Sequence, residues 1–119
     1  MDRSMEPRQL AGEPELEAAL AAGPFLLFKH SRICPISARA FGEYRAYLES
    51  HPATPTAWID VIGQRPLSQS VAASTGVRHQ SPQILLFSNG AVTWHASHGA
   101  ITRDSLAAAV DQDGSGANT

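Results

Sequence analysis

Four short runs of strand-forming residues constrain the fold of this 119-residue chain most. Turn-forming residues lie at their borders, and the most apolar run, PFLLF, is far too short to cross a bilayer. Asn89-Gly90 separates the last two runs, and this dipeptide is the strongest local signal for a β-hairpin. The predicted strands are therefore 25–28 (FLLF), 57–62 (AWIDVI), 83–88 (QILLFS) and 91–97 (AVTWHAS).

Helical patterns occupy the segments before, between and after these strands. Three of the segments have a proline in the first turn, and two of them are followed directly by a glycine. Thr102 is placed to cap a fourth segment. The predicted helices are 13–22, 35–50, 65–75 and 103–110. The second is the longest, and its apolar face consists of Ile36, Ala40, Phe41, Tyr44, Tyr47 and Leu48.

The order of elements indicates a single α/β domain. Because the early strands alternate with helices, we expect them to be parallel and joined by right-handed crossovers. The last two strands form an antiparallel hairpin on the same sheet. We therefore predict a thioredoxin-like fold, a four-stranded mixed sheet flanked by helices, over residues 13–110, with a flexible lead-in at 1–12 and a disordered tail at 111–119.

Charge and cysteine content narrow the class of partner. A net charge of −2 gives no reason to expect nucleic acid or a membrane as a partner. The first residues lack the apolar core of a secretory signal. A single cysteine cannot form an internal disulfide, which fits a reducing compartment. We therefore expect a cytoplasmic protein.

Cys34, the single cysteine, lies between the first predicted strand and the helix that begins at Pro35. Helix N-termini carry partial positive charge and unpaired N–H groups, which favour a thiolate over a thiol. Lys29, His30 and Arg32 add positive charge nearby. We therefore predict that Cys34 is the nucleophile of a thiol–disulfide exchange. The alternative is an inert, buried cysteine.

Ser37 stands where a dithiol redox motif would have its second cysteine. A hydroxyl cannot attack a mixed disulfide, so an external thiol must release whatever Cys34 has bound. Two roles for Ser37 stay open. Its hydroxyl could donate a hydrogen bond to the Cys34 sulfur, or it could satisfy N–H groups in the first turn of the helix.

Pro82 directly precedes the third predicted strand. In thioredoxin folds a cis-proline stands at this point, opposite the reactive cysteine, so we predict a cis bond between Ser81 and Pro82. The backbone of Ser81 would then pair with an incoming disulfide partner. The alternative is an ordinary trans-proline at the start of an edge strand.

His30 and His79 are the histidines closest to the predicted centre. His30 could raise the local positive potential or donate a proton to a leaving thiolate. Otherwise it is a strand-end histidine that makes one backbone hydrogen bond. His79 lies three residues before Pro82, and we expect it to belong to a loop.

The segment WHASH contains two further histidines, His95 and His98. Their spacing invites a metal site, but zinc usually needs three or four ligands, and no further cluster of ligand residues accompanies them. We therefore predict no metal site and expect these histidines to pack the end of the hairpin. Trp58 and Trp94 are expected in the core of the sheet.

The chain resembles the YtxJ-like family of monothiol bacilliredoxins between Phe25 and Ile101. The resemblance rests on FKHSRICPIS, on WIDVIGQRPLSQSVAASTGVRHQSPQILLFSNG and on VTWHASHGAIT. These contain, in order, the family's CPIS motif, its GVxHxSPQ segment and its WHxSHxxIT segment. The family often has Thr before the reactive cysteine, where this chain has Ile33.

The resemblance implies a function. A bacilliredoxin attacks the mixed disulfide between bacillithiol and a client protein, frees the client thiol and carries bacillithiol on its own cysteine. By this resemblance Cys34 is the nucleophile, Pro35, Ser81 and Pro82 border the incoming disulfide, and an external thiol or reductase system regenerates the protein. Bacillithiol is then a thiol co-substrate, with no bound cofactor. Its malate carboxylates would be held by cations near Cys34, for which Lys29, Arg32 and Arg78 are candidates; the alternative is solvated surface charge.

Three other functions remain open. A redox-inactive thioredoxin-fold adaptor would form no adduct with thiols. A thiol-based sensor would form the adduct but would change partner binding rather than repair a client. A monothiol glutaredoxin-like carrier of an iron–sulfur cluster would use a CGFS motif, whose glycine and phenylalanine are absent here.

Overall fold

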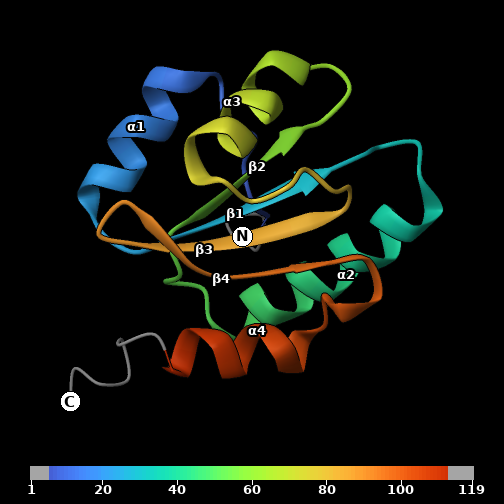
Figure 1. The fold of residues 1–119 in the computed structure, drawn as a ribbon. Helices are drawn as coiled ribbons and strands as arrows, with labels where there is room; N and C mark the ends of the chain where they lie inside the picture. Colours follow the sequence, from blue (N-terminus) through green and yellow to red (C-terminus); the bar gives the residue numbers. More distant parts are fainter. Residues whose placement is uncertain (1–5, 113–119) are drawn as a thin grey trace.

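Residues 6–112 of the computed structural model are described, and they are built around one four-stranded sheet in the order β2-β1-β3-β4 (Figure 1). The strands are β1 (Phe25–His30), β2 (Thr56–Asp60), β3 (Gln83–Ser88) and β4 (Ala91–Ser97). Strand β1 pairs in parallel with β2 and antiparallel with β3, and β3 and β4 form the predicted antiparallel hairpin. The expected mixed sheet is therefore confirmed, with the parallel relation limited to the first two strands.

The helices lie in two layers, one on each face of the sheet (Figure 1). Helices α1 (Glu13–Ala22) and α3 (Arg65–Thr75) cover one face. Helices α2 (Pro35–Ser50) and α4 (Arg103–Val110) cover the other, and the short 3₁₀ helix η2 (His98–Ala100) joins β4 to α4. All four predicted helices have the predicted bounds. A proline lies in the first turn of three of them, a threonine caps the start of α4, and a glycine follows α1 and α3.

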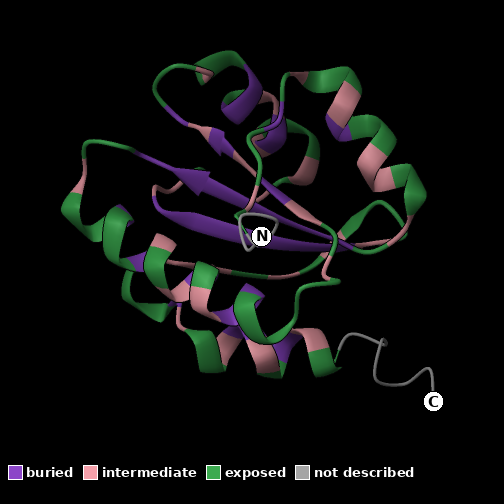
Figure 2. Ribbon diagram, turned by 180° about the vertical axis from the view of Figure 1, so that it is seen from behind, coloured by how far each residue is buried: buried purple, intermediate pink, exposed green. Residues whose placement is uncertain are grey.

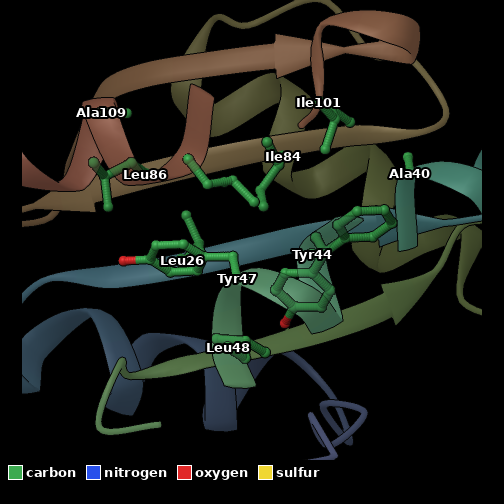
Figure 3. Close-up of a cluster of buried hydrophobic side chains, with 11 residues drawn as sticks. Leu26, Ala40, Tyr44, Tyr47, Leu48, Ile84, Leu86, Ile101 and Ala109 are labelled. Carbon is green, nitrogen blue, oxygen red and sulfur yellow. The ribbon is translucent and has the colours of Figure 1, made fainter. Parts of the chain in front are cut away.

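Burial follows this layering (Figure 2). Every residue of β1 is buried, as expected for a central strand covered on both faces. Side chains on the α2 and α4 side form one core cluster, which includes Leu26, Tyr44 and Ile84 (Figure 3). Those on the α1 and α3 side form a second. Trp58 and Trp94 are partly buried against the first cluster, so their predicted place in the core is confirmed.

The ends of the first two strands differ from the prediction. Strand β1 continues two residues further, through Lys29 and His30. Strand β2 stops at Asp60, although the apolar pattern runs on to Ile62. The carboxylate of Asp60 accepts the backbone N–H groups of Ile62 and Gly63, at 3.0 and 3.1 Å, and so turns the chain out of the sheet.

Part of the predicted flexible lead-in is ordered. The N–H of Leu10 donates to the carbonyl of Trp58 at 2.9 Å, and the N–H of Trp58 donates to the carbonyl of Arg8 at 3.0 Å. Leu10 is buried in the second core cluster. The lead-in therefore covers the outer edge of β2, and the prediction is wrong for residues 8–10. Residues 1–5 and 113–119, which hold the start of the predicted lead-in and most of the predicted tail, lie outside the described residues.

Ile36 also differs from its predicted place in the core. Its side chain is 55% exposed, whereas Ala40, Tyr44, Tyr47 and Leu48 on the same helix are buried and Phe41 is partly buried. The first turn of α2 follows the loop that leaves β1, so it extends past the sheet (Figure 1). Within residues 6–112, no helix is long and apolar enough to span a membrane.

Candidate functional site

Cys34 is the N-cap residue of α2. Its backbone is extended, with φ −106° and ψ 122°, and its carbonyl accepts the N–H of Ala38 at 3.0 Å. The side chain is partly exposed and makes no hydrogen bond within the described part of the chain. The predicted position between strand and helix is thus confirmed. At this position, the positive end of the α2 dipole stabilises negative charge that develops on the sulfur during reaction.

Ser37 lies one turn further along α2 and is fully buried. Its hydroxyl oxygen accepts the N–H of Ser31 at 2.9 Å and lies 2.7 Å from Nδ1 of His30. Neither predicted role describes these contacts, because the hydroxyl bonds neither the Cys34 sulfur nor an N–H of the helix's first turn. Ser37 instead fastens the loop that carries Cys34 to the end of β1.

His30 is enclosed by aromatic rings. Its imidazole stacks on Phe41 with ring centroids 4.3 Å apart. The rings of Phe28 and Trp58 are steeply inclined to it, with centroids 5.7 and 5.4 Å away. Burial lowers the pKa of His30; Asp60 opposes this shift and Arg32 adds to it. A neutral ring at pH 7 does not supply the positive potential that the sequence suggested. Its role as a proton donor stays a prediction.

The structure separates the three candidate cations. The amino group of Lys29 is fully buried without a hydrogen-bond partner, and burial lowers its pKa to about 8. Because side chains alternate along a strand, Lys29 shares the face of Phe25 and Leu27, which packs against α1 and α3. The reading of Lys29 as solvated surface charge is therefore wrong. The sequence-based prediction ended the strand at Phe28, so Lys29 was expected in an exposed loop rather than in the buried strand.

Arg32 and Arg78 both lie at the surface. The guanidinium of Arg32 is 3.9 Å from the Asp60 carboxylate, a long and exposed ion pair. The side chain of Arg78 is exposed in the loop after α3, while its backbone carbonyl accepts Nε2 of Gln83 at 3.0 Å. Pro35, at the first position of α2, is exposed beside Cys34.

The bond between Ser81 and Pro82 is cis, as predicted. The carbonyl of Pro82 accepts the N–H of His98 at 3.1 Å. Gln83, the next residue, pairs with Lys29 near the end of β1. The start of β3 and the end of β1 therefore share one edge of the sheet, and Cys34 and Pro82 both lie at that edge. The hydroxyl of Ser81 is buried without a partner.

The remaining histidines surround this edge of the sheet. His79 belongs to a loop, as expected, and its Nδ1 lies 3.3 Å from the hydroxyl of the buried Ser68. Burial lowers the pKa of His79, with smaller contributions from Lys29 and Arg65. His95 and His98 are exposed, so the prediction that they pack the hairpin end is wrong.

Metal ligands do not gather at this edge. No three His, Cys, Asp or Glu side chains among residues 6–112 come together in a group that could hold a metal ion.

Exposed apolar side chains border the thiol, which the sequence reading missed. Ile33 is 80% exposed and Ile36 is 55% exposed, one residue before and two after Cys34. The side chain of Ile62 is also 50% exposed. Its backbone N–H donates to the carboxylate of Asp60, which lies 3.9 Å from the guanidinium of Arg32. Such a grouping is typical of a surface that contacts another protein. The sequence did not predict this exposure, because Ile36 lies at helical spacing with the apolar residues of α2 and was therefore expected in the core.

Comparisons with known proteins agree with this geometry. A family model described as Monothiol bacilliredoxin BrxC matches residues 9–106. A solved structure described as a candidate oxidoreductase with a thioredoxin fold is 32% identical, has a TM-score of 0.83, and the match covers 87% of this chain and 93% of that one.

More distant structures share the fold alone. A thioredoxin variant from Halobacterium salinarum NRC-1 is 22% identical, with a TM-score of 0.72 over 92% of this chain and 91% of its own. The oxidised thioredoxin of Plasmodium falciparum is 10% identical, with a TM-score of 0.69 over 90% and 97%. The predicted thioredoxin-like fold is confirmed.

Proposed function

Because the chain belongs to the monothiol bacilliredoxin family, we propose that it removes bacillithiol from mixed disulfides with client proteins. One observation carries this proposal. Cys34, which carries the chain's single thiol, is the N-cap residue of α2, and its side chain is partly exposed and free of hydrogen bonds within residues 6–112. The residue one turn further along the helix is a buried serine.

The proposed reaction exchanges one disulfide for another. The Cys34 thiolate attacks the bacillithiol sulfur, a disulfide forms between the two, and the client sulfur leaves as a thiolate that takes a proton from water. No net oxidation or reduction occurs in this step. A second thiolate, from bacillithiol or a reductase, then attacks the adduct and frees Cys34. Ser37 cannot perform this second attack.

The surroundings of the thiol support attack on a protein-bound disulfide. Ser37 and Ser31 fasten the loop, so Cys34 is held at the helix terminus before substrate arrives. The exposed Ile33 and Ile36 side chains supply apolar contacts to a client surface. The backbone of Ser81, before the cis bond, is the proposed partner for the client's extended chain.

Intact mass spectrometry tests the proposal. The protein is incubated at neutral pH with oxidised bacillithiol, with oxidised glutathione and the Cys34→Ala variant as controls. We expect one bacillithiol adduct that is absent in Cys34→Ala and forms much more slowly with glutathione. Absence of an adduct with either thiol would leave a redox-inactive adaptor as the better account, and equal reaction with both would remove the case for bacillithiol.

A further inference from the structure

A hollow of about 380 Å³ lies beside the cis-proline, between the loop that follows α3 and the end of β4. The N–H of His98 at its rim donates to the carbonyl of Pro82, so the hollow adjoins the sheet edge that carries Cys34. Its lining consists of Gly76, Val77, Arg78, Gln80, Gln83, His95, Ser97 and His98.

The charged groups of this lining have one sign. Arg78 is exposed and permanently cationic, and the exposed imidazoles of His95 and His98 are further N–H donors. No Asp or Glu belongs to the lining. An anion in the hollow would therefore meet hydrogen-bond donors and no opposing carboxylate.

Gln83 is a buried polar residue in the hollow with one unused atom. Its Nε2 donates to the carbonyl of Arg78 at 3.0 Å and to the hydroxyl of Ser97 at 3.4 Å. Since a carbonyl only accepts, this contact fixes which end of the amide is nitrogen. The oxygen Oε1 is left without a partner, which is costly for a buried acceptor. A ligand hydroxyl, or a water held with the ligand, would satisfy it.

Lys29 adds a cation behind the lining. It is the direct cross-strand neighbour of Gln83, and such pairs have Cβ atoms about 4.5–5.5 Å apart. Its amino group is buried without a hydrogen-bond partner. A buried charge is screened less than one in water, so Lys29 and Arg78 together favour a ligand with more than one negative charge.

We propose that this hollow binds a small dicarboxylate group, the malate end of the bacillithiol whose disulfide Cys34 attacks. The inference rests on the proposed function for the identity of the thiol. The guanidinium of Arg78 pairs with one carboxylate, and His98 and His95 donate to the other. Arg78 is thus a specificity-determining residue for the small thiol.

Rate constants for two disulfides test the assignment. The loss of Cys34 thiol is followed with oxidised bacillithiol and with hydroxyethyl disulfide, which has no charge. In Arg78→Gln, the rate constant for oxidised bacillithiol divided by that for hydroxyethyl disulfide should fall about tenfold. This corresponds to the loss of one charge-assisted hydrogen bond. The matched control is Arg39→Gln, which removes an exposed arginine of α2 outside the hollow and leaves the ratio within about twofold. An unchanged ratio in Arg78→Gln, or an equal fall in both variants, would overturn the assignment.

A ligand titration separates this inference from the proposed function. L-malate is added to the Cys34→Ala protein, and amide shifts are followed by ¹H–¹⁵N NMR. Saturable shifts in residues 76–80 and 95–98 that Arg78→Gln weakens support the hollow, whether or not bacillithiol reacts at Cys34. Absence of saturable shifts there overturns the hollow as a dicarboxylate site, even if the Cys34 adduct forms.

Discussion

At the scale of single residues, Ser37 and Lys29 show how little a residue's type reveals about its surroundings. Ser37 occupies the position of a resolving cysteine, but its hydroxyl is hydrogen-bonded to the backbone N–H of Ser31 and to the imidazole of His30. Lys29 looks like surface charge in the sequence and is fully buried in the structure. Both depend on contacts that form only when the chain folds, so residue type and spacing alone do not predict them.

Ser37→Ala should destabilise the fold. The change leaves the N–H of Ser31 and Nδ1 of His30 without their partner, and an unsatisfied buried group costs about 1–3 kcal/mol. The free energy of unfolding in urea measures the loss. Ser50→Ala, on the exposed end of the same helix, is the control and should lose less than about 0.5 kcal/mol. Equal losses in the two variants would contradict the role of Ser37.

Lys29 should make stability depend on pH. Its pKa is about 8 in the folded protein and about 10.4 when unfolded, so the unfolded state binds more protons between these values. Stability should therefore rise with pH above about 8. Burial also raises the pKa of Tyr44 and of Tyr47 in the folded protein. Because the tyrosines of the unfolded chain ionise first, stability falls as the pH approaches 10, and the rise due to Lys29 should be seen only up to about pH 9.5.

Lys29→Met tests this dependence. Methionine keeps most of the side-chain volume and removes the buried charge, so stability at pH 7 should increase by up to about 3 kcal/mol. Urea unfolding of both proteins is measured from pH 7 to 9.5. The rise with pH should be present in the wild type and absent in the variant. The same slope in both proteins would rule out Lys29 as its source.

At the scale of elements, the sequence predicts the bounds of the helices, but it predicts the loop that carries Cys34 only in part. Proline marks the start of α2, and proline and glycine mark the two ends of α3, so these bounds are predicted correctly. The ends of β1 and β2 depend on tertiary contacts. Asp60 turns the chain while its neighbours are still apolar, and β1 continues through polar residues because both its faces are covered. The exposure of Ile36 likewise depends on tertiary structure, because the first turn of α2 extends past the sheet.

The combined change of Ile33→Ser and Ile36→Ser should slow transfer from a protein disulfide. Loss of apolar contacts to the client should reduce that rate by about three- to tenfold. The reaction with oxidised bacillithiol, which contacts no client surface, should change by less than about twofold. Both rates are followed by loss of the Cys34 thiol. Equal slowing with both substrates would show that the isoleucines shape the thiol's own environment rather than a docking surface.

At the scale of the whole molecule, the fold brings three separate segments to one edge of the sheet. The end of β1, the start of β3 and the end of β4 meet there, since Gln83 pairs with both Lys29 and Ser97. The sequence predicted the thioredoxin-like fold, the place of Cys34 and the cis bond before Pro82. It did not predict the hollow between residues 76–80 and 95–98, because that depends on the packing of two distant loops.

Transfer of bacillithiol between two proteins tests the central claim most directly. A client protein carrying one bacillithiol on a cysteine is mixed with an equal amount of this protein, and both intact masses are followed. We predict that the client loses one bacillithiol as Cys34 gains one, and that Cys34→Ala abolishes the transfer. Bacillithiol that stays on the client, or a lasting disulfide between Cys34 and the client, would contradict the account.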